Sequence, residues 1–110
     1  MSHLILLGDS IFDNAAYTNG GPDVVTQLND LLPAGWAASL LAIDGSTTDD
    51  SAGQVGCLPA DASHLVLSVG GNDALRQAHL LFAPAASTEE AIGLLADLAE
   101  QFEHDYRAAV

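Results

Sequence analysis

Three short, almost continuously apolar runs constrain the fold of this chain more than any other feature. They read "HLILL" at 3–7, "WAASLLAI" at 36–43 and "HLVLSV" at 64–69. Apolar residues that do not alternate with polar ones are typical of strands buried on both faces of a parallel sheet. Helical spacing fills the intervening segments, so the sequence predicts an α/β fold in a single domain over residues 1–110.

Two helices are indicated both by spacing and by signals at their ends. Between 24 and 32, apolar residues recur every three or four positions, with Pro22 suited to the first turn and "PAG" as the stop. Ser87 and Glu90 have capping-box spacing at the start of the last helix. The apolar stripe of that helix is Ile92, Leu95, Ala99, Phe102 and Tyr106. Shorter helical stretches are expected at 48–56 and 74–81.

The chain carries a large excess of negative charge. Fifteen acidic residues stand against Arg76 and Arg107 alone, for a net charge of −13. Such a surface repels phosphates, so we expect no partner among nucleic acids or anionic membranes. Cys57 is the only cysteine and cannot form a disulfide within the chain. No apolar stretch is long enough to cross a bilayer and no secretory signal is visible, so the default expectation is a soluble cytoplasmic protein.

Each apolar run ends in a polar, glycine-containing loop. The loops read "GDSIFDN" from Gly8, "DGSTTDD" from Asp44 and "GGNDAL" from Gly70. Because the carboxyl ends of parallel strands meet at one edge of a sheet, these loops are expected to lie together. Ligands of open α/β sheets bind beyond that edge, so the sequence predicts a functional site there.

The three loops hold the groups that an acyl-transfer site needs. Ser10 follows a strand, where its hydroxyl and its main-chain N–H can face the same cavity. Gly45 has no Cβ, so its N–H can approach a substrate oxygen closely. Asn72 carries an amide NH₂ of the right kind to bind an oxyanion. A nucleophile and three oxyanion donors would thus surround one carbonyl group.

Other roles are open to each of these residues. Gly-Asp-Ser after a strand is often only a turn, and Gly45 can be a turn glycine. Asn72 and Asp73 stand where a helix N-cap is expected. The aspartates of the first two loops could hold Mg²⁺ as in phosphoryl-transfer receivers, although the lysine that such sites use is absent; they are Asp9, Asp13, Asp44, Asp49 and Asp50.

The three loops together resemble the first three sequence blocks of the SGNH (GDSL-type) hydrolase family. The matching segments are "GDSIFDN" at 8–14, "DGSTT" at 44–48 and "VGGNDAL" at 69–75, in the same order and with similar spacing, and the resemblance covers most of the chain. It implies a flavodoxin-like three-layer α/β/α fold with three parallel strands in the order 2-1-3. It also implies hydrolysis of a small-molecule ester, without a cofactor or a metal ion.

The resemblance assigns roles residue by residue. It makes Ser10 the nucleophile and, through its N–H, the first oxyanion donor, with Gly45 as the second donor and Asn72 as the third. Asp9 and Asp73 match positions that mainly support loop geometry. Asp13 is a further supporting residue of the first loop.

The family's general base, a histidine in a late D-x-x-H block, has no counterpart here. His3 and His64 open their strands at the opposite edge of the sheet, while His79 and His104 lie well along helices. One interpretation is that the chain is the N-terminal portion of a longer hydrolase. The other is a divergent branch with a carboxylate base, Asp13 or the pair Asp49 and Asp50.

We favour the first interpretation, because the third strand would otherwise leave an apolar edge open. A missing C-terminal segment or a second copy of the chain is then expected to cover the edge at 64–69. The rival to a hydrolase is a catalytically inactive flavodoxin-like module that binds a ligand or a partner.

Overall fold

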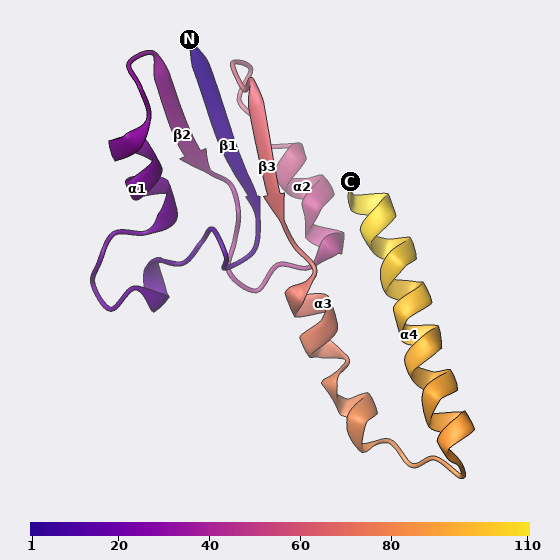
Figure 1. Ribbon diagram of the computed structural model, residues 1–110. Coiled ribbons are helices and arrows are strands. Elements are labelled where there is room, and N and C mark those ends of the chain that lie inside the picture. The colour runs from indigo at the N-terminus through magenta and orange to yellow at the C-terminus, as the bar shows by residue number, and fades with distance from the viewer.

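The computed structural model describes residues 1–110, and at its centre lies a sheet of three parallel strands (Figure 1). Strand β1 covers Ser2–Gly8, β2 covers Trp36–Leu40 and β3 covers His64–Ser68. The strand order is β2-β1-β3, as predicted. Pairing is in register, with Ile5 of β1 opposite both Ser39 of β2 and Leu65 of β3.

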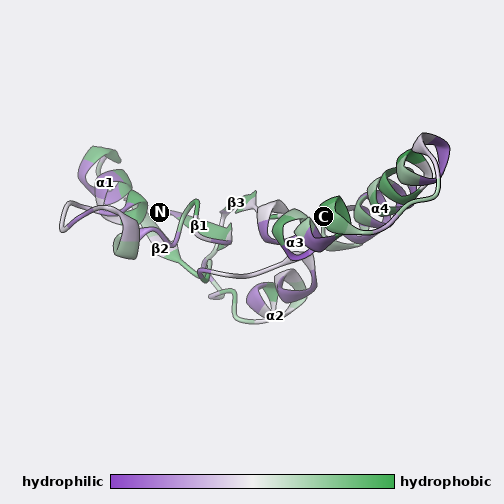
Figure 2. Ribbon diagram, turned by 90° about the horizontal axis from the view of Figure 1, so that it is seen from below, coloured by the Kyte–Doolittle hydropathy of each residue, from purple (hydrophilic) through white to green (hydrophobic).

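Helices connect the strands and lie on both sides of the sheet, which confirms the predicted α/β fold (Figure 2). The α-helices are α1 (Val24–Leu31), α2 (Ser51–Val55), α3 (Gly71–Arg76) and α4 (Thr88–Ala109). Three short 3₁₀ helices complete the chain: η1 (Ala15–Tyr17), η2 (Thr48–Asp50) and η3 (Ala78–Phe82). None of the helices combines the length and the apolar character that a membrane crossing requires.

Several element ends differ from the predictions, each for a local reason. Pro22 lies before α1 rather than in its first turn, because Asp23 is the N-cap and accepts a hydrogen bond from Thr26 N–H at 3.1 Å. The second apolar run leaves the ladder after Leu40, since the N–H groups of Leu41 and Ala42 both donate to the Leu6 carbonyl. The helical stretch expected at 74–81 is divided into α3 and η3.

The core is small and is centred on β1. Ile5 and Leu6 are 0% and 1% exposed. Consecutive strand residues point to opposite faces, so both faces of β1 are covered. Only 13 of the 110 residues are buried, however, and the apolar stripe predicted for α4 leaves Ile92 and Leu95 largely exposed.

The two outer strands of the sheet differ in how their edges are covered. Asn29 of α1 lies beside β2, where its side chain accepts from Ala38 N–H and donates to the Ala38 carbonyl, both at 2.9 Å. The side chain thus occupies the outward-facing main-chain groups of Ala38, in the middle of β2, which a further strand would need. No strand pairs with β3 on its outer side, and Leu65 and Val66 are 52% and 40% exposed.

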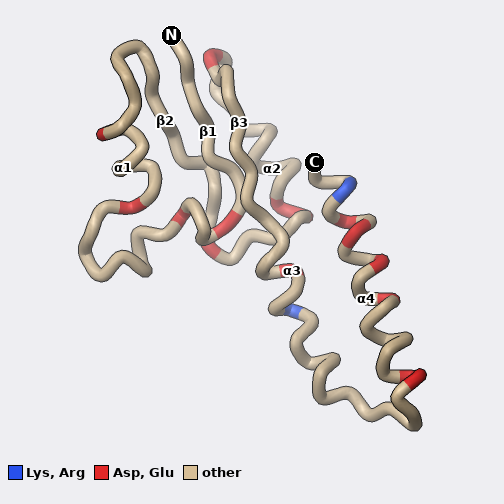
Figure 3. Tube along the Cα trace, in the orientation of Figure 1, with Lys and Arg blue, Asp and Glu red and all other residues tan.

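The second half of the chain extends away from the sheet. From β3 the chain leaves through α3 and η3, turns, and runs back as α4, whose C-terminal end lies near α2 (Figure 1). The molecule measures 60 × 32 × 19 Å with a radius of gyration of 17.6 Å, against roughly 13 Å for a compact domain of this length. Acidic residues line the loops below the sheet and much of α4 (Figure 3).

Candidate active site

The first loop begins at a glycine that no other residue can replace. Gly8 has φ +119°, and a Cβ there would lie 1.8 Å from the carbonyl oxygen of Ser68. Asp9 follows and is buried; its carboxylate accepts from Ile11 N–H, while its carbonyl accepts from Phe12 and Asp13. A tight turn results, closed by the side chain and the carbonyl of Asp9.

Ser10 occupies this turn, directly beyond the carboxyl end of β1. It is half-buried, and neither its hydroxyl nor its main-chain N–H has a hydrogen-bond partner within the chain. A partly exposed N–H group such as this one can bond to water or to a ligand, whereas a fully buried one is almost always paired within the protein. The hydroxyl and the N–H of Ser10 are therefore both free to meet a ligand.

The second loop presents a similar unpaired donor at Gly45. Ser46 N–H donates to the Ile43 carbonyl at 3.1 Å, which closes a turn in which Gly45 has φ +87°. A Cβ at Gly45 would touch nothing within 4 Å, so the backbone conformation, and not crowding, is what favours glycine. The Gly45 N–H has no partner within the chain.

The third loop reaches across to the second through two side chains. Asn72 Nδ2 donates to the Ser46 carbonyl at 3.0 Å, which leaves the second hydrogen of this amide group without a protein partner. Asp73 accepts from Thr48 N–H at 3.0 Å and from Thr48 Oγ1 at 2.7 Å. Gly70 is the N-cap of α3, so neither Asn72 nor Asp73 has the capping role that was the alternative for them.

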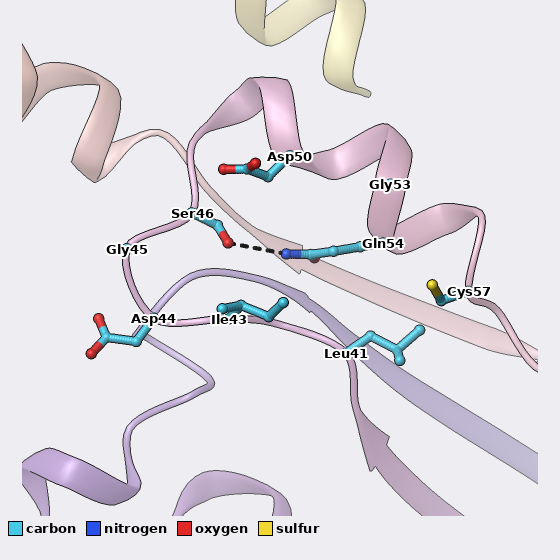
Figure 4. Close-up of a pocket in the computed structure, with 9 residues that line it drawn as sticks. All are labelled: Leu41, Ile43, Asp44, Gly45, Ser46, Asp50, Gly53, Gln54 and Cys57. Carbon is cyan, nitrogen blue, oxygen red and sulfur yellow. Dashed lines mark hydrogen bonds between the residues drawn. The ribbon is translucent and has the colours of Figure 1, made fainter.

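Gln54 of α2 joins the first two loops and was missed by the sequence analysis. Its buried amide accepts from Gly8 N–H at 2.7 Å and donates to the Gly8 carbonyl at 2.9 Å and to Ser46 Oγ at 3.3 Å (Figure 4). Together with Asn72, it connects the first, second and third loops in one hydrogen-bonded network. The only feature of the sequence that could have indicated this role is the polar Gln54 on the side of a short helix that faces the sheet.

Asp13 also ties the first loop to the second. Its carboxylate accepts from Asp44 N–H at 2.7 Å, and the Asp44 carboxylate accepts from the Tyr17 hydroxyl at 2.7 Å. The hydrogen bond to Asp44 and the charge of that carboxylate raise the pKa of Tyr17, because both disfavour a phenolate. Asp13 thus supports loop geometry, which is one of the two roles considered for it.

No general base contacts Ser10, because its Oγ is hydrogen-bonded to no acceptor. Asp50 is engaged by Thr47 in a capping box. His79 is the second residue of η3, with its ring against the Arg76 carbonyl. His104 is less remote than its place along α4 suggests, because α4 runs back toward η2. It lines a cavity with Asp49, outside the first loop.

The acidic residues do not assemble into a metal centre. No three histidine, cysteine, aspartate or glutamate side chains are placed to hold one metal ion together. Asp9, Asp13 and Asp73 each accept main-chain or hydroxyl hydrogens instead. Their arrangement is that of loop supports.

An open cavity of about 490 Å³ lies beside the second loop, over α2 (Figure 4). Gly45, Ser46 and Gln54 form its polar end, and Leu41, Ile43 and Cys57 are apolar in character along its length. Of the three predicted catalytic residues only Gly45 lines it. The cavity therefore adjoins the site and does not contain Ser10 or Asn72.

The comparisons with known proteins add no family to this description. No protein-family model matches the chain, and no curated protein matches it.

Proposed function

We propose that the chain is a serine hydrolase of carboxylic esters, of the kind found in the SGNH family. One observation carries the proposal. Ser10 N–H and Gly45 N–H have no partner within the chain, and Asn72 has a spare amide hydrogen. All three belong to loops at the same edge of the sheet that are cross-linked by hydrogen bonds, and unpaired donors of this kind are what an oxyanion requires.

In the proposed reaction, Ser10 Oγ attacks the ester carbonyl carbon while its proton passes to a general base. No residue of this chain contacts Ser10 Oγ in that role, so we assign the base to the further segment expected from the sequence. The negative charge that develops on the carbonyl oxygen is stabilised by Ser10 N–H, Gly45 N–H and the Asn72 amide. The protonated base returns this proton to the departing alkoxide as the tetrahedral intermediate collapses, which releases the alcohol and leaves an acyl group on Ser10. Water then attacks the acyl-enzyme, which releases the acid and restores the hydroxyl.

The charge around the site favours one class of substrate. Asp9, Asp13 and Asp44 carry carboxylates in the two loops nearest Ser10, and the whole chain is strongly acidic. A small neutral ester is therefore a better substrate than an anionic one. The proposed reaction requires no cofactor. The cytoplasmic location expected from the sequence remains part of the proposal.

A second candidate function follows from the free hydroxyl of Ser10. Without a general base in contact, the chain would be a flavodoxin-like binding or scaffolding module rather than an enzyme. A fluorophosphonate probe separates the two, because it reacts with activated serines. Labelling mapped to Ser10 supports the hydrolase, whereas a folded protein whose Ser10 stays unlabelled supports the module.

Replacing Asn72 with alanine tests the third oxyanion donor. Removal of one such donor is expected to lower kcat for p-nitrophenyl acetate by about 10²–10³-fold. KM should change little, because the donor acts on charge that is present only in the transition state. The measurement is a set of steady-state rates over a range of substrate concentrations.

A matched variant distinguishes this role from the anchoring of the loop. Thr48→Val removes the neighbouring hydrogen bond to Asp73 and leaves the Asn72 amide in place. We expect less than about a ten-fold fall in kcat, because Thr48 supplies no oxyanion donor. Loss of this buried hydrogen bond to a carboxylate should instead lower stability, by about 1.5–3 kcal/mol. Equal losses in the two variants would mean that Asn72 only holds the loops together.

We also propose that the open edge of β3 is paired in the assembled protein, either by a further segment of chain or by a second copy. The exposed Leu65 and Val66 support this, as does the contrast with β2, whose edge Asn29 occupies. Apolar edge strands are normally covered in folded proteins.

Sedimentation and hydrogen exchange test the pairing of β3. In the assembled protein, the main-chain N–H groups of residues 65–69 should exchange as slowly as those of β1. A monomer of 11.3 kDa that unfolds cooperatively while every second N–H of β3 exchanges at the rate of a loop would contradict the proposal.

A further inference from the structure

Three side chains at the other end of the sheet, away from Ser10, form a chain of hydrogen bonds. Ser39 Oγ of β2 lies 2.7 Å from His3 Nε2 of β1, and His3 Nδ1 lies 2.9 Å from Asp61 Oδ1. This serine–histidine–aspartate order occurs in the hydrolytic triads of unrelated folds, which are recognised by geometry and not by sequence position.

The carboxylate fixes which ring nitrogen carries the hydrogen. An ionised Asp61 can only accept, so the neutral ring of His3 donates from Nδ1 to it. Nε2 is then left with a lone pair directed at the Ser39 hydroxyl, which donates to it. The same partner holds the pKa of Asp61 below its usual range, because the hydrogen bond from His3 favours the ionised form. In this tautomer Nε2 has the free lone pair that a general base needs.

The cluster is independent of the candidate active site. His3 and Gly8 are five residues apart on one strand, or about 16 Å at the rise of a β-strand. The His3 side chain is 17% exposed, Asp61 is 75% exposed and Ser39 is half-buried, so reagents can enter while the base is partly shielded. The proposed ester hydrolysis at Ser10 uses none of the three.

We propose that Ser39 is a second reactive serine, with His3 as its base and Asp61 as the residue that positions the ring. Its ligands are activated acyl or phosphoryl compounds with a good leaving group. The Oγ–H proton passes to His3 Nε2 as Oγ bonds to the carbonyl carbon or phosphorus. The bond to the leaving group breaks, and the group departs with its electron pair.

A neighbouring pair supplies an internal comparison. Ser63 Oγ lies 2.9 Å from His64 Nδ1, but it also accepts from His3 N–H at 2.8 Å and lies 3.2 Å from the His3 carbonyl. No carboxylate contacts His64. Ser63 therefore has a histidine beside it without the arrangement that makes a base, and it should not react.

The test uses the Ser10→Ala chain, diisopropyl fluorophosphate and peptide mapping by mass spectrometry. Label is expected on Ser39 and not on Ser63. His3→Gln should lower the labelling rate of Ser39 by about 10²-fold or more, since a general base contributes that much. Asp61→Asn should lower it roughly ten-fold, because water around an exposed carboxylate weakens its effect on the ring.

Two results would overturn the proposal. No label on Ser39 in a protein whose circular dichroism is native overturns the proposal, and so does a rate that Asp61→Asn leaves unchanged. Asp61 is on the surface, so that variant stays informative even where His3→Gln fails to fold. Label on Ser10 in the unsubstituted chain reports separately on the proposed hydrolase, so each idea can fail without the other.

Discussion

In the full-length protein, the Ser10→Ala variant is expected to lose its hydrolysis of p-nitrophenyl acetate almost completely. The substitution removes the attacking oxygen and leaves the oxyanion donors in place, and loss of a serine nucleophile costs about 10⁶-fold in kcat in enzymes that form an acyl-enzyme. Because the Ser10 side chain makes no hydrogen bond, the fold should be unaffected. Initial rates of p-nitrophenolate release, with circular dichroism as a check on folding, measure the effect.

Ser2→Ala is the matched control, since Ser2 is a partly buried serine at the opposite end of β1. Its rate should equal that of the unsubstituted chain. Turnover that survives in Ser10→Ala would remove the serine mechanism. Slow residual acetylation of Ser39 can be recognised as a single stoichiometric event that ceases after one equivalent.

Gly8→Ala is expected to unfold the domain. An alanine Cβ would lie 1.8 Å from the Ser68 carbonyl oxygen, at a backbone φ of +119° that side chains rarely adopt. The strand ends of β1 and β3 would have to separate, which breaks the hydrogen bond from Asp9 N–H to that same oxygen. We expect a loss of about 4 kcal/mol or more in the free energy of unfolding, measured by urea denaturation.

Gly93→Ala is the control for this substitution. A Cβ at Gly93 meets nothing within 4 Å, and the residue lies inside α4. Alanine there should leave stability unchanged or raise it by about 0.5–1 kcal/mol. A Gly8→Ala chain with native stability would mean that β1 and β3 do not approach as closely as described.

The sheet could be predicted because its signals are local. Each strand is a continuous apolar run, and each ends in glycine and polar residues, so both the strands and the loops that meet at their ends are visible along the chain. The order of the strands also followed from the resemblance. The path of α4 could not be predicted. The spacing of its apolar residues shows which face of the helix is apolar, but not the direction in which the helix runs relative to the sheet.

The site was predictable only in part, for a related reason. Ser10, Gly45 and Asn72 lie in the segments that follow the three strands, and the free donors at Ser10 and Gly45 agree with the roles proposed for them. Gln54 binds both Gly8 and Ser46 from a helix 46 residues further along than Gly8, and no spacing rule indicates such a contact. The contact of Ser39 with His3 likewise depends on strand register, which the sequence alone does not specify.

The side chain of Asn29 has a consequence for self-association. Fibres that grow by adding strands side by side need two exposed edge strands on every molecule, one for each neighbour. In this protein Asn29 of α1 covers the edge strand β2 with a pair of hydrogen bonds. Copies joined through β3 can therefore form a closed pair but cannot polymerise. Loss of the Asn29 amide would expose the edge of β2 as well, and would allow aggregation through strand addition.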